Sequence, residues 1–126
     1  MRAVDTSVLV RLIARDDATQ VDAAEAFVES GAWVSHIVLA ETVWVLGSVY
    51  GLDAARIAQA IAMLLEHDRL VLQDGDVVRA AIQMFRDQSK VGFADCLIVQ
   101  AARKAGHQPV ATFDIAMSGL QGATNL

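Results

Sequence analysis

His36-Ile37-Val38-Leu39-Ala40-Glu41-Thr42-Val43-Trp44-Val45-Leu46-Gly47-Ser48-Val49-Tyr50 is the stretch around which this chain is organised. Its side chains are apolar on nearly every face of a helix, which predicts a helix that runs through the core. Glu41 is the only Asp, Glu, Lys or Arg between Glu29 and Asp53. A buried carboxylate is costly unless a hydrogen-bond network, a cation or a metal compensates it. No basic residue lies one helical turn away, so the partner of Glu41 must come from elsewhere in the chain or from a bound ion.

On both sides of this helix, short apolar segments typical of strands alternate with longer segments that have helical periodicity. Strands are expected at residues 3–4, 32–34, 70–72 and 109–112, with a candidate edge strand at residues 123–126. Helices are expected at residues 7–13, 18–30, 36–50 and 93–105. A further helix is expected to follow its cap Asp53, and another to open at Asp74 or Asp76 and run through Phe85. The alternation predicts an α/β fold: a single three-layer α/β/α domain over residues 1–126, with a parallel central sheet of four to five strands.

Length and composition narrow the class of protein. The chain has 126 residues, enough for one domain. Its mean hydropathy of +0.41 is high for a soluble monomer and favours an interface with a second subunit or a partner. No uninterrupted apolar run is long enough to cross a membrane. The absence of a signal-peptide pattern and the single cysteine, Cys96, favour a reducing cytoplasm. The formal charge of −5 argues against nucleic-acid binding, unless several acids belong to a metal site.

Four acidic residues stand apart from other charges. They are Asp5, Glu41, Asp95 and Asp114, and each lies in an otherwise uncharged segment. Asp5 and Asp114 directly follow expected strands, which places them at the carboxyl edge of a parallel sheet, where ligands bind in such folds. Each Asp has an alternative structural explanation as a helix cap or first-turn residue, but Glu41 has none. A cluster of the four would repel itself without a cation, and Mg²⁺ or Mn²⁺ takes such oxygen ligands.

Four ordered motifs resemble the PIN domain. They are Val4-Asp5-Thr6-Ser7-Val8-Leu9, Leu39-Ala40-Glu41, Phe93-Ala94-Asp95 and Thr112-Phe113-Asp114. The short length and the segment Ala94-Asp95-Cys96-Leu97-Ile98 most resemble the VapC-type toxins of toxin–antitoxin pairs within that family. Two positions depart from the family pattern: Ser7 stands where many members carry Asn, and Ile115-Ala116-Met117 follows Asp114 where many carry a basic residue.

The resemblance implies a Mg²⁺- or Mn²⁺-dependent endoribonuclease. Asp5, Glu41, Asp95 and Asp114 would form its catalytic and metal-binding set. Thr6, Ser7 and Thr112 are expected to orient carboxylates or water. VapC-like toxins form homodimers and are neutralised by a cognate antitoxin, so both partners are expected, beside an RNA substrate. Arg11, Arg15, Arg86 and Lys90 are candidates to contact phosphates, with Arg11 and Arg15 on one face of a helix.

Two other interpretations remain open at this point. One is a non-catalytic PIN-like module that binds proteins, which the apolar composition permits. The other is a receiver-like domain with Asp74 as phosphoacceptor after the third strand. A receiver domain would carry an acidic pair after its first strand and a Lys before its last Pro. Here Asp5 stands alone and Gln108 precedes Pro109, which makes this the weaker alternative.

Overall fold

The computed structural model describes all residues from Met1 to Leu126, in two compact units. The first unit covers Met1–Gly75 and the second Asp76–Leu126. All five strands pair in parallel, as the alternating sequence predicted, and the chain is α/β throughout. The strands form a three-stranded and a two-stranded piece rather than one continuous sheet. Each strand is only two or three residues long, so each piece is joined by few ladder hydrogen bonds.

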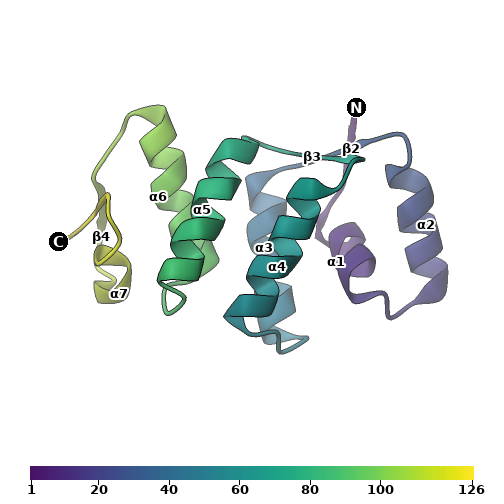
Figure 1. Cartoon of the computed structure of the whole chain (residues 1–126), viewed down its shortest axis with the longest axis horizontal. Helices are drawn as coiled ribbons and strands as arrows, with labels where there is room; N and C mark the ends of the chain where they lie inside the picture. The colour runs from purple at the N-terminus through teal and green to yellow at the C-terminus, as the bar shows by residue number, and fades with distance from the viewer. The chain divides into compact units, whose positions relative to one another are not determined.

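The first unit is built on the sheet order β1-β2-β3. Its elements are β1 (Arg2–Ala3), α1 (Thr6–Ala14), α2 (Ala18–Val28), β2 (Ala32–Val34), α3 (His36–Ser48), α4 (Ala54–Glu66) and β3 (Leu70–Leu72). Figure 1 shows β2 and β3 along one edge of this unit, with α1, α3 and α4 below them. One side of the strands is buried through Ala32, Val34, Leu70 and Leu72, whereas Trp33 and Val71 are exposed on the other.

Helix boundaries in the first unit follow local capping chemistry. Ser35 begins α3 by accepting a hydrogen bond from the backbone N–H of Val38 at 3.1 Å, and Asp53 begins α4 in the same way through Arg56. Asp17 caps α2 through the N–H of Gln20. Such side chains satisfy N–H groups that have no partner inside the helix.

The second unit contains α5 (Gly75–Asp87, which begins at the last residue of the first unit), α6 (Phe93–Ala105), β4 (Val110–Thr112), α7 (Ile115–Ser118) and β5 (Ala123–Asn125). Its core joins α5 to α6, where the rings of Phe85 and Phe93 meet edge to face at 6.0 Å. Gly106 ends α6 with a φ of 82°, a left-handed conformation that favours glycine. β4 and β5 pair through Val110 and Ala123.

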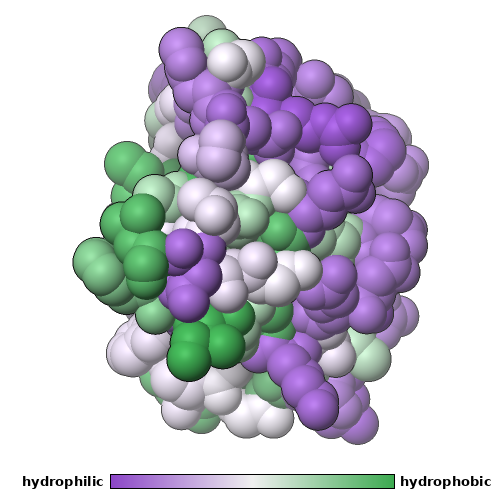
Figure 2. All heavy atoms as spheres, turned by 90° about the vertical axis from the view of Figure 1, so that its left-hand side faces the viewer, coloured by the Kyte–Doolittle hydropathy of each residue, from purple (hydrophilic) through white to green (hydrophobic).

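Several large apolar side chains of the second unit are exposed. They are Ile98, Phe113, Ile115 and Leu126. The face seen in Figure 2 has apolar side chains gathered toward one side and polar side chains over the other. No helix in the structure has the length and apolarity that crossing a membrane requires.

Candidate acidic site

Asp5 lies between β1 and α1 and is the N-cap residue of α1. Its Oδ1 accepts hydrogen bonds from the backbone N–H of Ser7 at 3.0 Å and from the Ser7 hydroxyl at 2.6 Å. The hydrogen bond from the Ser7 side chain is the main cause that lowers the pKa of Asp5, because it stabilises the ionised form. Thr6 is the first residue of α1 and is half-buried. The carboxylate of Asp5 is therefore ionised, exposed and fixed in direction.

Glu41 is exposed on α3, so the expectation that it lies buried in the core is wrong. The buried side of α3 is formed by Leu39, Thr42 and Leu46. Glu41 lies on another side, where Ile37 is 73% exposed and Trp44 is 69% exposed. The helix is apolar on more than one side, and only one of them packs in the core of the unit. Periodicity could not distinguish the two sides, because both carry apolar residues.

Asp95 and Asp114 lie close enough to influence each other in the second unit. Asp95 is in the first turn of α6, and Asp114 is the N-cap of α7. Burial raises the pKa of Asp95, and the negative charge of Asp114 raises it further. Asp114 accepts a hydrogen bond from the N–H of Met117 at 3.0 Å, and its own N–H donates to the Thr112 hydroxyl at 3.0 Å. Thr112 thus orients the backbone of Asp114 rather than its carboxylate.

The four predicted acids are divided between the units. Asp5 and Glu41 belong to the first unit, where Asp5 caps α1 and Glu41 lies on α3, which packs against α1; Asp95 and Asp114 belong to the second unit. Neither unit by itself holds three or more His, Cys, Asp or Glu side chains placed to bind a metal ion. The donor chemistry nevertheless fits Mg²⁺ or Mn²⁺, because carboxylates are hard oxygen ligands. The Asp95–Asp114 pair also carries a charge conflict that a cation would relieve. The approach of Glu41 to Asp5 and Asp95 stays a prediction.

The order and type of these acids agree with one known family. A family model described as PIN domain matches residues 2–122. The chain belongs to the PIN-domain family. Among solved structures, a similar one is the crystal structure of Mycobacterium tuberculosis VapC20, a sarcin–ricin loop cleaving toxin. It is 23% identical, with a TM-score of 0.44, over 94% of this chain and 93% of that chain. No curated protein matches.

The basic residues of this PIN domain are placed differently from the expectation. Arg11 lies on α1 and pairs with Asp16, but Arg15 follows the end of α1 with a φ of 54° and pairs with Glu25 at 2.7 Å. The expectation that both share one helical face is therefore wrong, since the helix ends at Ala14. Arg86, in the last turn of α5, and Lys90, in the following loop, are both exposed.

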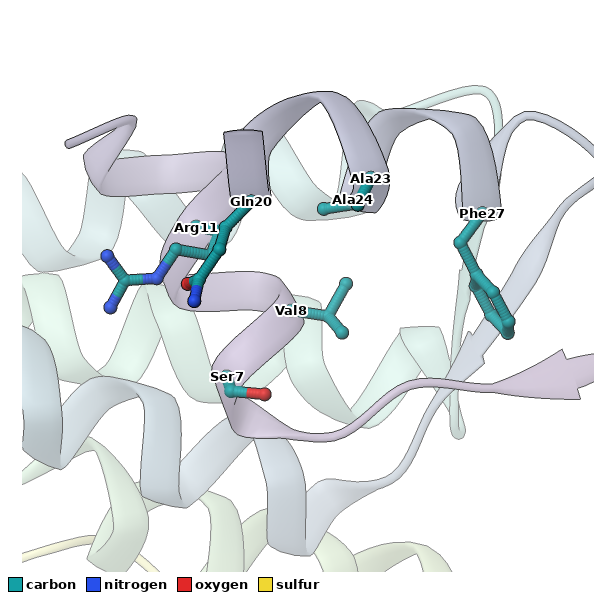
Figure 3. A pocket seen from close by; sticks show the side chains of 7 residues that line it. All are labelled: Ser7, Val8, Arg11, Gln20, Ala23, Ala24 and Phe27. Atoms are coloured by element: carbon teal, nitrogen blue, oxygen red, sulfur yellow. The ribbon is translucent and has the colours of Figure 1, made fainter. Parts of the chain in front are cut away.

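One feature of the PIN domain was not predicted from sequence. A pocket of about 360 Å³ opens between α1 and α2, and its lining residues are Ser7, Val8, Arg11, Gln20, Ala23, Ala24 and Phe27 (Figure 3). We call it the α1–α2 pocket. Ser7 joins it to the acidic site, because the same hydroxyl donates to Asp5. Gln20 and Phe27 carry no sequence signal for such a role, since the pocket exists only once two helices pack.

Proposed function

We propose that this PIN domain is a metal-dependent endoribonuclease of the VapC-like toxin type. Asp5, Glu41, Asp95 and Asp114 are its proposed catalytic and metal-binding residues, with Mg²⁺ or Mn²⁺ as the cofactor. Residues 1–126 are proposed to act as one domain, which the family match over residues 2–122 supports because it spans both units. Membership of the PIN family leaves the receiver-like interpretation of Asp74 without support.

The observation that carries the proposal is that Asp95, in the first turn of α6, lies near Asp114, the N-cap of α7: burial raises the pKa of Asp95, and the negative charge of Asp114 raises it further. The negative charge of Asp114 contributes to the raised pKa of Asp95, and this repulsion destabilises the folded protein. Separating the two acids or neutralising one of them would relieve the repulsion. Such conflicts concentrate at functional sites, where a ligand resolves them. This chain belongs to the PIN family and also contains Asp5 and Glu41. A divalent cation is the ligand that would balance the negative charges of these acids.

The chain's own residues hold and orient the reacting groups. A bound divalent ion would supply an activated water and offset charge on the phosphate. Ser7 keeps Asp5 ionised and fixes its Oδ1 with two hydrogen bonds, one from the Ser7 hydroxyl and one from its backbone N–H. Glu41 is exposed on α3, so its carboxylate is accessible to a ligand. Thr112 sets the backbone at Asp114, and the cap to Met117 sets its side chain.

The proposed partners follow from the VapC-like resemblance and the exposed apolar surface. Ile37 and Trp44 on α3, with Phe113 and Ile115 beside Asp114, are large side chains that a monomer would ordinarily cover. A homodimer contact and an antitoxin contact are proposed to cover such surfaces. Beyond these, the proposal includes an RNA substrate and a cytoplasmic location.

The test is metal-dependent cleavage by purified protein. Wild type, Asp5→Asn and Glu41→Gln, purified in parallel, are incubated with structured RNA in EDTA, Mg²⁺ or Mn²⁺, and metal binding is measured by calorimetry. Cleavage by wild type that is lost in both variants and in EDTA supports the proposal. Equal cleavage by all three proteins indicates a contaminating ribonuclease. If metal affinity is equal as well, the catalytic assignment is wrong, and a non-catalytic protein-binding module becomes the better interpretation.

A further inference from the structure

The α1–α2 pocket has a polar end and an apolar end. Ser7, Arg11 and Gln20 form the polar end, whereas Val8, Ala24 and Phe27 line the remainder (Figure 3). Its volume of about 360 Å³ falls within the range of small-molecule sites. A ligand that fills it must combine a polar group with a larger apolar part.

The polar end holds a hydrogen-bond donor without an acceptor. Arg11 Nε is buried and has no partner, while the terminal nitrogen of the same guanidinium binds Asp16. Asp16 is itself held by the Tyr50 hydroxyl at 2.8 Å, so Arg11 is fixed in place. A buried N–H without an acceptor is costly, which points to an acceptor that arrives with a ligand. A guanidinium matches the geometry of a phosphate, and because Nε is buried, a phosphate reaches it only when a neighbouring side chain such as the exposed Gln20 moves aside.

The apolar end offers a surface suited to a flat ring. Phe27 is half-buried, and the guanidinium of Arg2 lies over its ring at 3.9 Å from the centroid. Arg2 also reaches the backbone oxygen of Phe27 at 3.4 Å. Arg2 therefore stands by the apolar end of the pocket, whereas at the polar end the charge of Arg11 is paired with Asp16 and the Ser7 hydroxyl is bonded to the Asp5 carboxylate.

We propose that the α1–α2 pocket binds one unpaired nucleotide of the RNA substrate. Its phosphate accepts the Nε–H of Arg11, and its base lies against Val8, Ala24 and Phe27. The inference rests on the proposed ribonuclease function and adds a specificity site to it. Because Ser7 lines the pocket and also bonds to Asp5, the bound nucleotide is a near neighbour of the one that is cut. Only a base outside a duplex can enter a pocket, so the site selects loops and single strands.

The direct test is nucleotide binding by the full-length chain in EDTA, where no cleavage occurs. Amide spectra from nitrogen-15 NMR are recorded with 5′-AMP, adenosine and inorganic phosphate. We expect AMP to shift the amides of Ser7, Val8, Gln20 and Ala24, with weaker effects from adenosine or phosphate alone. No shift in these amides at saturating AMP overturns the proposal. Identical shifts from inorganic phosphate and AMP overturn the part that concerns the base.

Two variants with matched controls test the pocket in the enzyme. Ala23→Phe fills the pocket from an exposed position of α2, and Ala26→Phe places the same ring at an exposed position outside it. Arg11→Gln removes the donor, and Arg56→Gln removes an exposed charge on α4. We expect Ala23→Phe and Arg11→Gln each to raise KM roughly tenfold with little change in kcat, as loss of a charged hydrogen bond would. The controls should match wild type.

Two further outcomes distinguish a failure of this inference from a failure of the proposed ribonuclease function. If Ala23→Phe cleaves RNA and binds AMP normally but escapes inhibition by the cognate antitoxin, the pocket is a protein-docking groove and the inference is wrong. If wild type shows no metal-dependent cleavage yet AMP shifts the pocket amides, the proposed function fails while nucleotide binding stands.

Discussion

Replacing Asp5 by Asn and by Ala separates its structural role from its proposed chemical role. Asp5 Oδ1 accepts the Ser7 N–H at 3.0 Å and thereby caps α1. Asn caps helices about as well as Asp, whereas Ala loses the bond at a typical cost of about 1 kcal/mol. For a chain of 126 residues, that loss lowers Tm by about 4 °C. Asp5→Asn should therefore keep near wild-type stability, and Asp5→Ala should lose this amount.

The assay combines thermal and urea unfolding in EDTA with RNA cleavage in Mn²⁺. Both variants should lose cleavage, because neither carries the carboxylate that is proposed to bind metal. Because both variants should be inactive, only their stability should distinguish Asp5→Asn from Asp5→Ala. Equal stability of Asp5→Asn and Asp5→Ala would refute the capping argument. Cleavage by Asp5→Asn at the wild-type rate would refute the catalytic assignment of Asp5.

Three further predictions concern the other acids and the thiol. Glu41→Gln should change the free energy of unfolding by less than about 0.5 kcal/mol, because the side chain is exposed and unpaired, yet abolish cleavage; a large loss of stability in urea would contradict this. In metal-free buffer, the free energy of unfolding should fall as pH rises from the unfolded-state pKa of 3.8 through the raised pKa of Asp95. The reason is that the folded protein keeps a proton that the unfolded chain has released, so urea titrations of Asp95→Asn should lack this fall. Burial raises the pKa of Cys96 to about 11, so Ellman's reagent at pH 8 should label it only after unfolding, and rapid labelling of folded protein would disprove its burial.

Local signals in the sequence determined most of the secondary structure and the family. Residues Ala32–Val34, Leu70–Leu72 and Phe93–Ala105 have the predicted bounds, since apolar runs, caps and a terminal Gly106 act over a few residues. The isolated acids also stand out in sequence alone, because charge is absent around them. Candidate functional residues that are recognised by residue type and spacing can therefore be predicted from the sequence alone.

The tertiary structure decided which sides of these elements are covered and which residues meet. Trp44 is exposed although α3 is apolar on nearly every side, and Glu41 is exposed with it, because burial depends on what packs against each side of the helix. The Asp95–Asp114 interaction and the α1–α2 pocket arise between segments that are separate in sequence. The unpartnered Nε of Arg11 is likewise a product of packing. Sequence determined the side chains available for function, and packing determined their neighbours, because contact between distant segments is set by the whole fold.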